Sequence, residues 1–333
     1  MDFFNNHSKL FKTALGLFLF LTTIIALIPA FNNQKNNAPL PNAIALTPDE
    51  IAGKAIFVAN GCVACHSQQV RNINMDKMYG SRPSIAADYA ANERTDIWRN
   101  TATLMGTERT GPDLTNIGNR QPSIAWHLLH LYQPRGVVEQ SIMPAYPWLF
   151  NTKDSITKNE VEVIVPDKFA INGKIVATKE ALQLVAYLQS LKQTPLPDGT
   201  PAQEFLYKKE LKNTTANNKL KLPDGVQLYT QNCQSCHQAN GEGLKGAFPS
   251  LKGSSVVNGN DLDLYVNIIM KGYDPRPEFA VMPAVGVNNN LSAEDITAII
   301  NHEKTSWGNN AKPVTAEEVK KIYDFIKLTA KKE

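Results

Sequence analysis

The chain has 333 residues and carries 34 Lys and Arg against 31 Asp and Glu, a formal net charge of +3 at pH 7. This length exceeds one ordinary domain, and the small net charge gives no sign of nucleic-acid binding. Only four cysteines are present. Their spacing therefore bears more on function than the composition does.

An apolar run without a charged residue extends over residues 13–31 and is long enough to cross a bilayer as a helix. Lysines precede this run, which predicts a cytoplasmic N-terminus with the rest of the chain outside. A cleaved signal peptide is the alternative, since Ala43-Ile44-Ala45 resembles a cleavage site, but that site lies well beyond the apolar run. We expect residues 1–31 to be a membrane anchor in lipid and residues 32–46 a polar tether.

The segment Thr47-Pro48-Asp49-Glu50 has the pattern of a helix start, with a capping threonine, a first-turn proline and a glutamate at the third position. The helix is predicted to end near Gly61, and the pentad Cys62-Val63-Ala64-Cys65-His66 follows at once. In a Cys-x-x-Cys-His pentad the two thiols lie one helical turn apart. They can bond to the two vinyl groups of one haem while the histidine ligates the iron.

The amino-acid composition changes between residues 151 and 176, where several valines and an Asn-Gly pair predict an inserted hairpin or loop. The next helix is indicated by apolar residues that recur on one face, namely Leu182, Val185, Leu188 and Leu191. This helix is expected to close a first domain at residues 47–193. Prolines, glycines and polar residues mark a linker at 194–222, in which Glu204 to Leu211 has the composition of a short helix.

The second domain is expected at residues 223–333. Its first helix is predicted to direct Val226, Leu228 and Tyr229 inward and to lead into a second pentad, Cys233-Gln234-Ser235-Cys236-His237. A helix beginning at Ser292, with Asp295 completing its cap, is expected to bury Ile296, Ile299 and Ile300. The last helix opens with the capping box Thr315-Ala316-Glu317-Glu318 and is expected to bury Val319, Ile322, Tyr323 and Ile326.

The two pentads account for all four cysteines, which predicts two covalently attached haem c groups held by Cys62, Cys65, Cys233 and Cys236. A disulfide or a chance match explains this repetition poorly. A zinc site would need further ligands, and the remaining histidines show no matching spacing. His66 and His237 are thus the expected iron ligands on one side of each haem.

An electron carrier needs a second axial ligand, and methionine raises the reduction potential. In the second domain Met282-Pro283 lies in a loop, whereas Met270 lies in an apolar run and is assigned to the core. In the first domain Met143-Pro144 is preferred, and the competing methionines are Met75, Met78 and Met105.

Other polar residues have more than one candidate role. His127 and His130 stand three apart, and either can replace Met143 as a ligand, although structural or interface roles are favoured. The carbonyls of Pro112 and Pro249 are expected to accept from the ligating imidazoles. Four arginines are candidates to neutralise haem propionates or a partner's carboxylates, with a solvated surface role as the alternative: Arg71, Arg109, Arg120 and Arg135.

At these residues the sequence resembles a known family, the membrane-anchored mono-haem cytochrome c subunit of cbb(3)-type haem-copper oxidases. The resemblance covers residues 1 to about 193 and rests on Gly61 to Arg71, Tyr79-Gly80, Asp88-Tyr89, Arg109 to Leu114, Trp126-His127, His130-Leu131, Pro134-Arg135 and Ser141 to Leu149. From Pro223 on, the chain is similar to a class I cytochrome c, through Cys233 to His237, Gly241 to Gly243, Phe248 to Leu251, Val257 to Gly259, Met282 to Ala284, Leu291-Ser292 and Ser306 to Asn309. The family's mono-haem subunit usually stops after the first domain.

The resemblance implies His66 and Met143 as ligands of the first haem. It also implies a single-pass protein of the bacterial cytoplasmic (inner) membrane with periplasmic haem domains. Its partners would be the haem-copper catalytic subunit, other oxidase subunits and a soluble or membrane cytochrome donor.

We therefore expect an all-α chain with an N-terminal transmembrane helix and two class I cytochrome c domains. It would pass electrons from a periplasmic donor to a cbb(3)-type terminal oxidase without catalysing a reaction by itself. The alternatives are the cytochrome subunit of a nitric oxide reductase, a di-haem cytochrome c peroxidase and a haem-based gas sensor. Two Met-Pro ligands and the anchor disfavour the peroxidase, which needs an iron open to peroxide.

Overall fold

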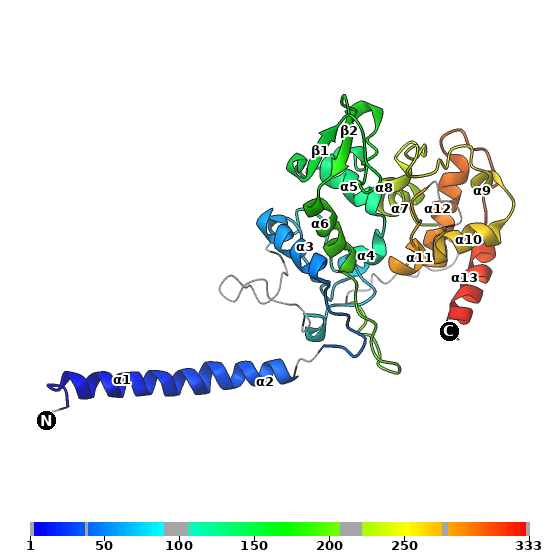
Figure 1. The fold of residues 1–333 in the computed structure, drawn as a ribbon. Coiled ribbons are helices and arrows are strands. Elements are labelled where there is room, and N and C mark those ends of the chain that lie inside the picture. The colour runs from blue at the N-terminus through cyan, green and yellow to red at the C-terminus, as the bar shows by residue number, and fades with distance from the viewer. Residues whose placement is uncertain are drawn as a thin grey trace. The chain divides into compact units, whose positions relative to one another are not determined.

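The structure is a computed structural model that describes residues 3–36, 39–89, 106, 108–206, 222–274 and 279–330. These residues are mostly helical and form two compact units, of which the first holds the N-terminal helix and the second holds both pentads (Figure 1).

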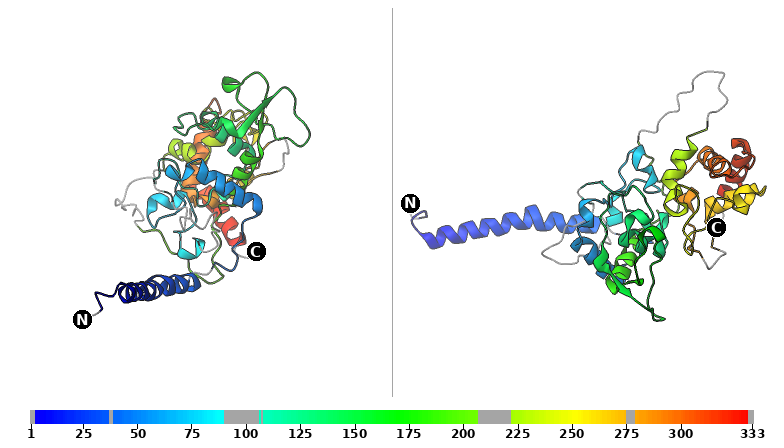
Figure 2. Two further views of the ribbon diagram at one scale, coloured as in Figure 1. Left: turned by 60° about the vertical axis from the view of Figure 1, so that its left-hand side comes forward. Right: turned by 90° about the horizontal axis from the view of Figure 1, so that it is seen from above.

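The N-terminal helix consists of α1 (His7–Thr22), the π-helical turn η1 (Thr23–Leu27) and α2 (Ile28–Asn36). Figure 2 shows these three segments as one continuous rod. Asn6 caps its start by accepting from the Lys9 backbone N–H at 3.0 Å. It is the one described helix long and apolar enough to cross a membrane. The predicted helix is thus present, but it continues to Asn36, beyond the expected start of the tether, since polar residues without proline extend the backbone hydrogen-bond ladder.

The first pentad is positioned by two helices that pack face to face, α3 (Pro48–Ala59) and α6 (Lys179–Ser190). The capping box at Thr47 is present, as predicted, with the Thr47 side chain and Glu50 satisfying each other's backbone N–H groups. The helices approach closely at Gly53, where a Cβ would lie 1.9 Å from the Gln183 carbonyl oxygen. One turn on, the rings of Phe57 and Tyr187 meet edge to face at 5.5 Å.

The helix predicted over Leu182 to Leu191 is α6, and Leu184, Val185, Tyr187 and Leu188 are buried in the core of the first domain. Along the chain, α4 (Ile117–Arg120) and α5 (Ile124–Tyr132) come between α3 and α6. Short 3₁₀ turns complete the second unit's N-terminal half: η2 (Cys62–Ala64), η3 (Asn74–Met78), η5 (Pro134–Gly136), η6 (Pro147–Leu149) and η7 (Asp167–Phe169). A further 3₁₀ turn, η4 (Ala86–Tyr89), belongs to the first unit.

The predicted insertion is a hairpin whose strands lie at its two ends. Strands β1 (Phe150–Lys153) and β2 (Lys174–Ala177) pair antiparallel, with Phe150 opposite Ala177. Gly173, at φ +100°, makes the turn into β2. The valine-rich stretch before it contributes only an isolated bridge from Glu162 to Val176.

Of the predicted linker at residues 194–222, the structure describes residues 194–206 and residue 222. Residues 204–206 are not helical, and the rest of the short helix expected from Glu204 to Leu211 lies outside the described residues.

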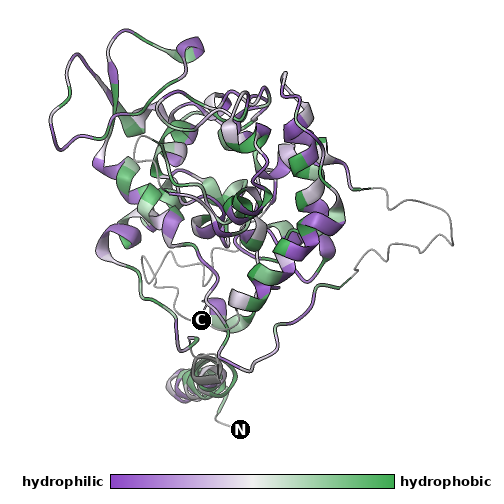
Figure 3. Cartoon of the chain, turned by 90° about the vertical axis from the view of Figure 1, so that its right-hand side faces the viewer, coloured by the Kyte–Doolittle hydropathy of each residue, from purple (hydrophilic) through white to green (hydrophobic). Residues whose placement is uncertain are grey.

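The described part of residues 223–330 contains these helices: α7 (Gly225–Asn232), α8 (Gln234–His237), α9 (Ser255–Asn258), α10 (Leu262–Lys271), α11 (Val285–Asn288), α12 (Ala293–Thr305) and α13 (Ala316–Ala330). The caps predicted at Ser292 and Thr315 are present. The three predicted isoleucines of α12 and Val319 and Ile326 of α13 are buried, and Ile322 and Tyr323 are partly buried. Figure 3 shows hydrophilic and hydrophobic stretches following one another along the chain's helices, as expected for helices with one apolar and one polar face.

One inward prediction in α7 is wrong. Val226 is 58% exposed, whereas Tyr229 is 2% exposed and Leu228 packs against the core. Positions 226 and 229 are three apart and share a broad face, but the helix begins only at Gly225, so Val226 lies in a first turn that the core does not cover.

Candidate haem sites

The first pentad begins where α3 ends. Gly61 adopts the left-handed conformation at φ +70°, which reverses the chain into η2 and places Cys62 in the core. The His66 ring follows, and its Nδ1 lies 2.8 Å from the Pro112 carbonyl oxygen. The predicted partner is confirmed. With Nδ1–H donating to this carbonyl, Nε2 carries the lone pair that an iron requires.

Gly111 packs directly against the His66 imidazole. A Cβ at Gly111 would lie 2.3 Å from His66 Cε1 and 2.7 Å from its Nδ1, far inside van der Waals contact. The backbone N–H of Gly111 also donates to the Cys65 carbonyl at 2.8 Å. The segment Gly111-Pro112 therefore fixes the histidine ring by contact with Gly111 and by a hydrogen bond at Nδ1.

The second pentad repeats this arrangement. Its α8 helix carries His237, whose Nδ1 lies 3.0 Å from the Pro249 carbonyl oxygen, again as predicted. Burial lowers the pKa of His66 and of His237, which favours the neutral ring that binds metal.

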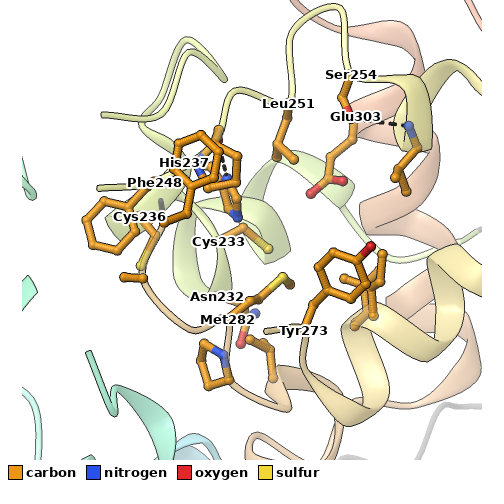
Figure 4. A pocket seen from close by; sticks show the side chains of 18 of the residues that line it. Asn232, Cys233, Cys236, His237, Phe248, Leu251, Ser254, Tyr273, Met282 and Glu303 are labelled. Carbon is orange, nitrogen blue, oxygen red and sulfur yellow. Dashed lines mark hydrogen bonds between the residues drawn. The ribbon is translucent and has the colours of Figure 1, made fainter. Parts of the chain in front are cut away.

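A cavity opens beside the second pentad. His237 and Met282 both line it, from opposite sides, together with Cys233, Cys236 and Phe248 (Figure 4). Met282 is held in place by a two-way backbone bridge with Tyr273, each N–H donating at 3.0 Å. Met270 instead lies in the hydrophobic core at 1% exposure, as predicted. Two cysteines, a histidine with a free Nε2 and a thioether around one mainly apolar cavity are a donor set that fits haem c.

Met143 packs against the core of the first domain and is partly buried. Its loop is tied to the first pentad through Tyr146, which hydrogen-bonds the Cys62 thiol and whose backbone N–H donates to the Leu131 carbonyl at 2.9 Å. Burial raises the pKa of this tyrosine to about 12. Among the competing methionines, Met75 is 70% exposed and Met105 lies outside the described residues. Met143 remains the predicted ligand.

A buried ionic cluster lies beside the first pentad. Asp76 is fully buried and accepts from the Arg71 backbone N–H at 2.7 Å, from the Arg71 side chain and from Arg109. Asp113, also fully buried, accepts from Ser67 Oγ and from the Gln69 backbone N–H, each at 2.7 Å. These carboxylates hold the Ser67 to Arg71 segment in place, so Arg71 and Arg109 are engaged within the protein.

The remaining two candidate arginines differ. Arg135 is exposed. Arg120 donates to the Asp113 backbone carbonyl and packs over the Tyr79 ring, while its Nε is buried without a partner. Burial lowers the pKa of Arg120 to about 10. An incompletely paired buried guanidinium is the residue of this set best suited to a carboxylate of a bound group.

The two extra histidines are interior groups. His127 Nε2 lies 2.8 Å from the Gln121 carbonyl oxygen, and burial lowers the pKa of this ring to about 4. His130 stacks on Trp126 at 4.6 Å between ring centroids, and burial lowers its pKa to about 3. Its Nδ1 is buried without a partner. His127 thus serves structure, and His130 stays the alternative ligand of the first site.

Three groups of consequence were not anticipated from the sequence: Asp76, Glu303 and the pair Gln121 and Trp126. Glu303 lines the cavity of the second pentad, is buried, and accepts from the Tyr265 hydroxyl. A glutamate among the apolar positions of α12 was the available signal for it. Asp76 and the pair have no such signal, because their partners lie far away in the sequence or in an irregular loop.

Comparison with known proteins agrees with this geometry. A family described as cytochrome c oxidase, mono-heme subunit/FixO, matches residues 2–173, more than half of the chain. The chain belongs to the FixO family. A cytochrome c family matches residues 223–307, so this FixO chain carries a second cytochrome c domain at its C-terminal end. Cytochrome c domains imply covalently bound haem c, and the protein is a cytochrome c electron-transfer subunit.

Relatives of this FixO chain include a cytochrome c and cytochrome subunits of two dehydrogenases. Cytochrome c-552 of Thermus thermophilus is 36% identical over 110 residues, which are 30% of this chain and 83% of that protein. The cytochrome c subunit of the quinone alcohol dehydrogenase of Gluconacetobacter polyoxogenes is 32% identical over 154 residues, 44% of this chain. The fructose dehydrogenase cytochrome subunit of Gluconobacter japonicus is 35% identical over 111 residues. The chain spans about a third of the length of the alcohol dehydrogenase subunit.

Proposed function

We propose that this protein is a di-haem subunit that passes electrons from a periplasmic donor to the haem-copper catalytic subunit of a cbb(3)-type terminal oxidase. The observation that carries the proposal is the FixO match over residues 2–173, which includes the apolar helix, the first pentad and the Met143 loop. The second cytochrome c domain would be the entry point for electrons.

Each site has a residue for every task that the proposal requires. Cys62 and Cys65, or Cys233 and Cys236, would hold a haem by thioether bonds. His66 or His237 would ligate the iron through Nε2, because Nδ1 is occupied by a proline carbonyl. The bound haem supplies a reversible one-electron couple.

The second axial positions are assigned to Met143 and Met282. A thioether ligand raises the reduction potential, which suits a carrier that delivers electrons to an oxygen-reducing centre. With both irons six-coordinate, neither site would offer an open position to peroxide or to a gas. This distinguishes the proposal from the peroxidase and the sensor.

The anchor would keep the haem domains at the membrane surface. Lys9 and Lys12, in the first turns of the apolar helix His7–Asn32, favour a cytoplasmic N-terminus. Both haem domains would then face the periplasm, where a soluble or membrane cytochrome donor can reach them.

Purification of the full chain from native membranes tests the partner. Solubilisation in mild detergent, capture of the chain and identification of what is retained should recover a haem-copper subunit, and the complex should consume oxygen with reduced cytochrome c. A copurifying catalytic subunit that reduces nitric oxide, with no oxygen consumption, would replace this proposal by the reductase. Carbon monoxide binding to the reduced chain alone would contradict two six-coordinate sites.

A second candidate function rests on the relatives. Cytochrome subunits of quinone alcohol dehydrogenase and fructose dehydrogenase are similar to part of this chain. In that case the chain would accept electrons from a dehydrogenase that oxidises an alcohol or a sugar. Retention of a dehydrogenase subunit in the same purification, and haem reduction by its substrate, would favour this candidate.

A further inference from the structure

The cavity of the second pentad is lined in part by residues of the FixO portion. Most of its lining comes from the C-terminal domain, but Arg120 and Gln121, at the end of α4, also line it. An electron leaves a buried haem most readily at the part of its cavity nearest the acceptor. The residues that line this side are therefore placed to take part in the transfer.

Direct bonds join these residues to the second pentad. The Gln121 side-chain amide donates to the Cys236 sulfur at 3.3 Å. Nearby, Trp126 Nε1 donates to the Ser235 carbonyl at 3.0 Å. Both acceptors lie within α8, inside the Cys-x-x-Cys-His pentad itself. Gln121 is 7% exposed, so the contact to the sulfur is shielded from water.

The same segment is bonded to the first pentad. Arg120, covalently next to Gln121, donates to the Asp113 carbonyl. Asp113 is covalently next to Pro112, whose carbonyl oxygen lies 2.8 Å from His66 Nδ1. One short chain of covalent bonds and three hydrogen bonds thus leads from the sulfur that would carry one haem to the imidazole that would ligate the other.

We propose that the Arg120-Gln121 segment is the electron-transfer bridge between the two haem sites. This inference rests on the proposed di-haem function and adds the route inside the chain. Electronic coupling decays much less along covalent and hydrogen bonds than across a gap. With both haems bound, one electron would pass from ferrous iron at the second site to ferric iron at the first, with no bond made or broken and no proton transferred.

Other contacts hold the two domains together without joining the sites. The Asn288 amide donates to the Asn119 carbonyl at 2.6 Å, and the Asn290 amide donates to the Gly80 carbonyl at 3.3 Å. Asn288 offers a matched control, because its loss removes one hydrogen bond between the domains and leaves the bridge in place.

The test is the rate of electron equilibration between the haems in the full, haem-loaded chain in detergent. The variant is Gln121→Leu, which removes the donor to the Cys236 sulfur and keeps the backbone carbonyl that accepts from His127. After partial photoreduction by a flavin, we expect equilibration to slow several-fold in Q121L and to stay near the parental rate in N288A. Both reduction potentials are titrated in each variant, so that a change in driving force is separated from a change in coupling.

Equal rates in Q121L and the parent, at unchanged potentials, would overturn the bridge. Equal slowing in Q121L and N288A would also overturn it, since general loosening of the domain contact would then explain both. Haem content separates these results from a failure of the proposed function: a chain that binds a single haem overturns both proposals, whereas two haems with unaltered rates overturn only this one. The identity of the partner complex affects neither outcome.

Discussion

At the scale of single residues, the two histidines that we propose as iron ligands are oriented in the same way. His66 and His237 each place Nδ1 on the carbonyl oxygen of a proline, at 2.8 and 3.0 Å. Proline has no N–H, so its carbonyl lies in a segment that does not continue a backbone ladder and remains available. This arrangement was predictable because both Gly-Pro-Asp-Leu and Phe-Pro-Ser-Leu follow their pentads in the sequence.

Replacement of one methionine should alter one haem. In Met143→His or Met282→His an imidazole replaces the thioether and stabilises the ferric state. The reduction potential of the altered haem should therefore fall substantially. A spectroscopic redox titration resolves the two couples, and the unaltered haem is the internal control. If both couples of M143H match those of the parent, another residue ligates the first haem, with His130 first in line.

Gly111→Ala should prevent assembly of the first site. The new methyl group would overlap the His66 ring, with 2.3 Å to Cε1, and the ring cannot move away without losing its bond to Pro112. We expect a pyridine haemochrome assay to find one haem per chain. Gly16→Ala in α1 is the control, because no atom lies within 4 Å of its Cβ position and its φ is not positive. Two haems in G111A would show that the ring tolerates displacement.

Glu303 should make the second haem sensitive to pH. Burial raises the pKa of this carboxyl to about 7, with the Tyr265 hydroxyl as its hydrogen-bond partner. The carboxyl is therefore neutral in acid and ionised in base, and the negative charge beside the cavity stabilises ferric iron. The potential of the second haem should fall as pH rises through about 7, and Glu303→Gln should flatten this dependence.

The same shift has a consequence for stability. Because the folded state holds this proton more tightly than the unfolded state does, the stabilisation is complete below the ordinary carboxyl pKa and is lost as pH rises through about 7. Glu317→Gln, on the exposed side of α13, is the control for both measurements. A parental potential that does not change across neutral pH would contradict the assignment.

At the scale of elements, the sequence predicted where helices begin, but it predicted less well which side chains of a helix are buried. The capping residues Thr47, Ser292 and Thr315 start helices as predicted because each cap is complete within four residues. Val226 is exposed because its face depends on which neighbours cover the first turn of α7. The hairpin was expected from the composition of its segment. Its strand pairing was not, because Phe150 and Ala177 lie at opposite ends of the insertion.

The ionic cluster around Asp76 ties η3, the pentad segment and the Arg109 loop into one element. Loss of its charge in Asp76→Asn leaves Arg71 without its buried ion-pair partner and Arg109 with only its 3.4 Å contact to Asp113, and we expect a loss of about 3 kcal/mol in the free energy of unfolding. Chemical denaturation followed by the first haem's absorbance measures it. The control is Glu162→Gln, since the Glu162–Lys174 pair is largely solvent-exposed and should contribute little.

The pH profile provides the check on this prediction. Although burial raises it, hydrogen bonds from Arg71 and Arg109 hold the pKa of Asp76 below its ordinary value. Its stabilisation is present above the ordinary carboxyl pKa and is lost as pH falls through the lowered one. D76N should therefore lose stability at neutral pH and lose less on acidification than the parent. Equal acid sensitivity of the two proteins would refute a charged Asp76.

At the scale of the whole molecule, the sequence indicated the apolar helix and both pentads but could not indicate their connection. Gln121 and Cys236 are joined by a hydrogen bond although 115 residues separate them in the sequence, and no periodicity or motif reports such a pair. Only the folded chain brings them together. The sequence therefore predicts the number of haem sites, whereas the tertiary contacts decide how electrons can pass between them.

The anchor can be tested on the intact protein. An apolar helix of this length should hold the chain in the membrane, so washing with alkaline carbonate should leave it in the pellet with both haems. A deletion of residues 3–31 behind a cleavable signal peptide should release it to the soluble fraction. A soluble mature protein that begins near Leu46 would show that the helix is removed.

The π turn at Thr23–Leu27 has a geometric consequence for that helix. The Ile28 backbone N–H donates to the Thr23 carbonyl, five residues back, which adds one residue to a single turn. Each residue of an α-helix turns about 100° around the axis, so the side chains of α2 are rotated by that angle from the stripe that α1 would continue. If this helix crosses a membrane, a neighbouring helix that follows α1 through one leaflet would meet a different flank of α2 in the other. One rod thus offers two separately oriented seams to its surroundings.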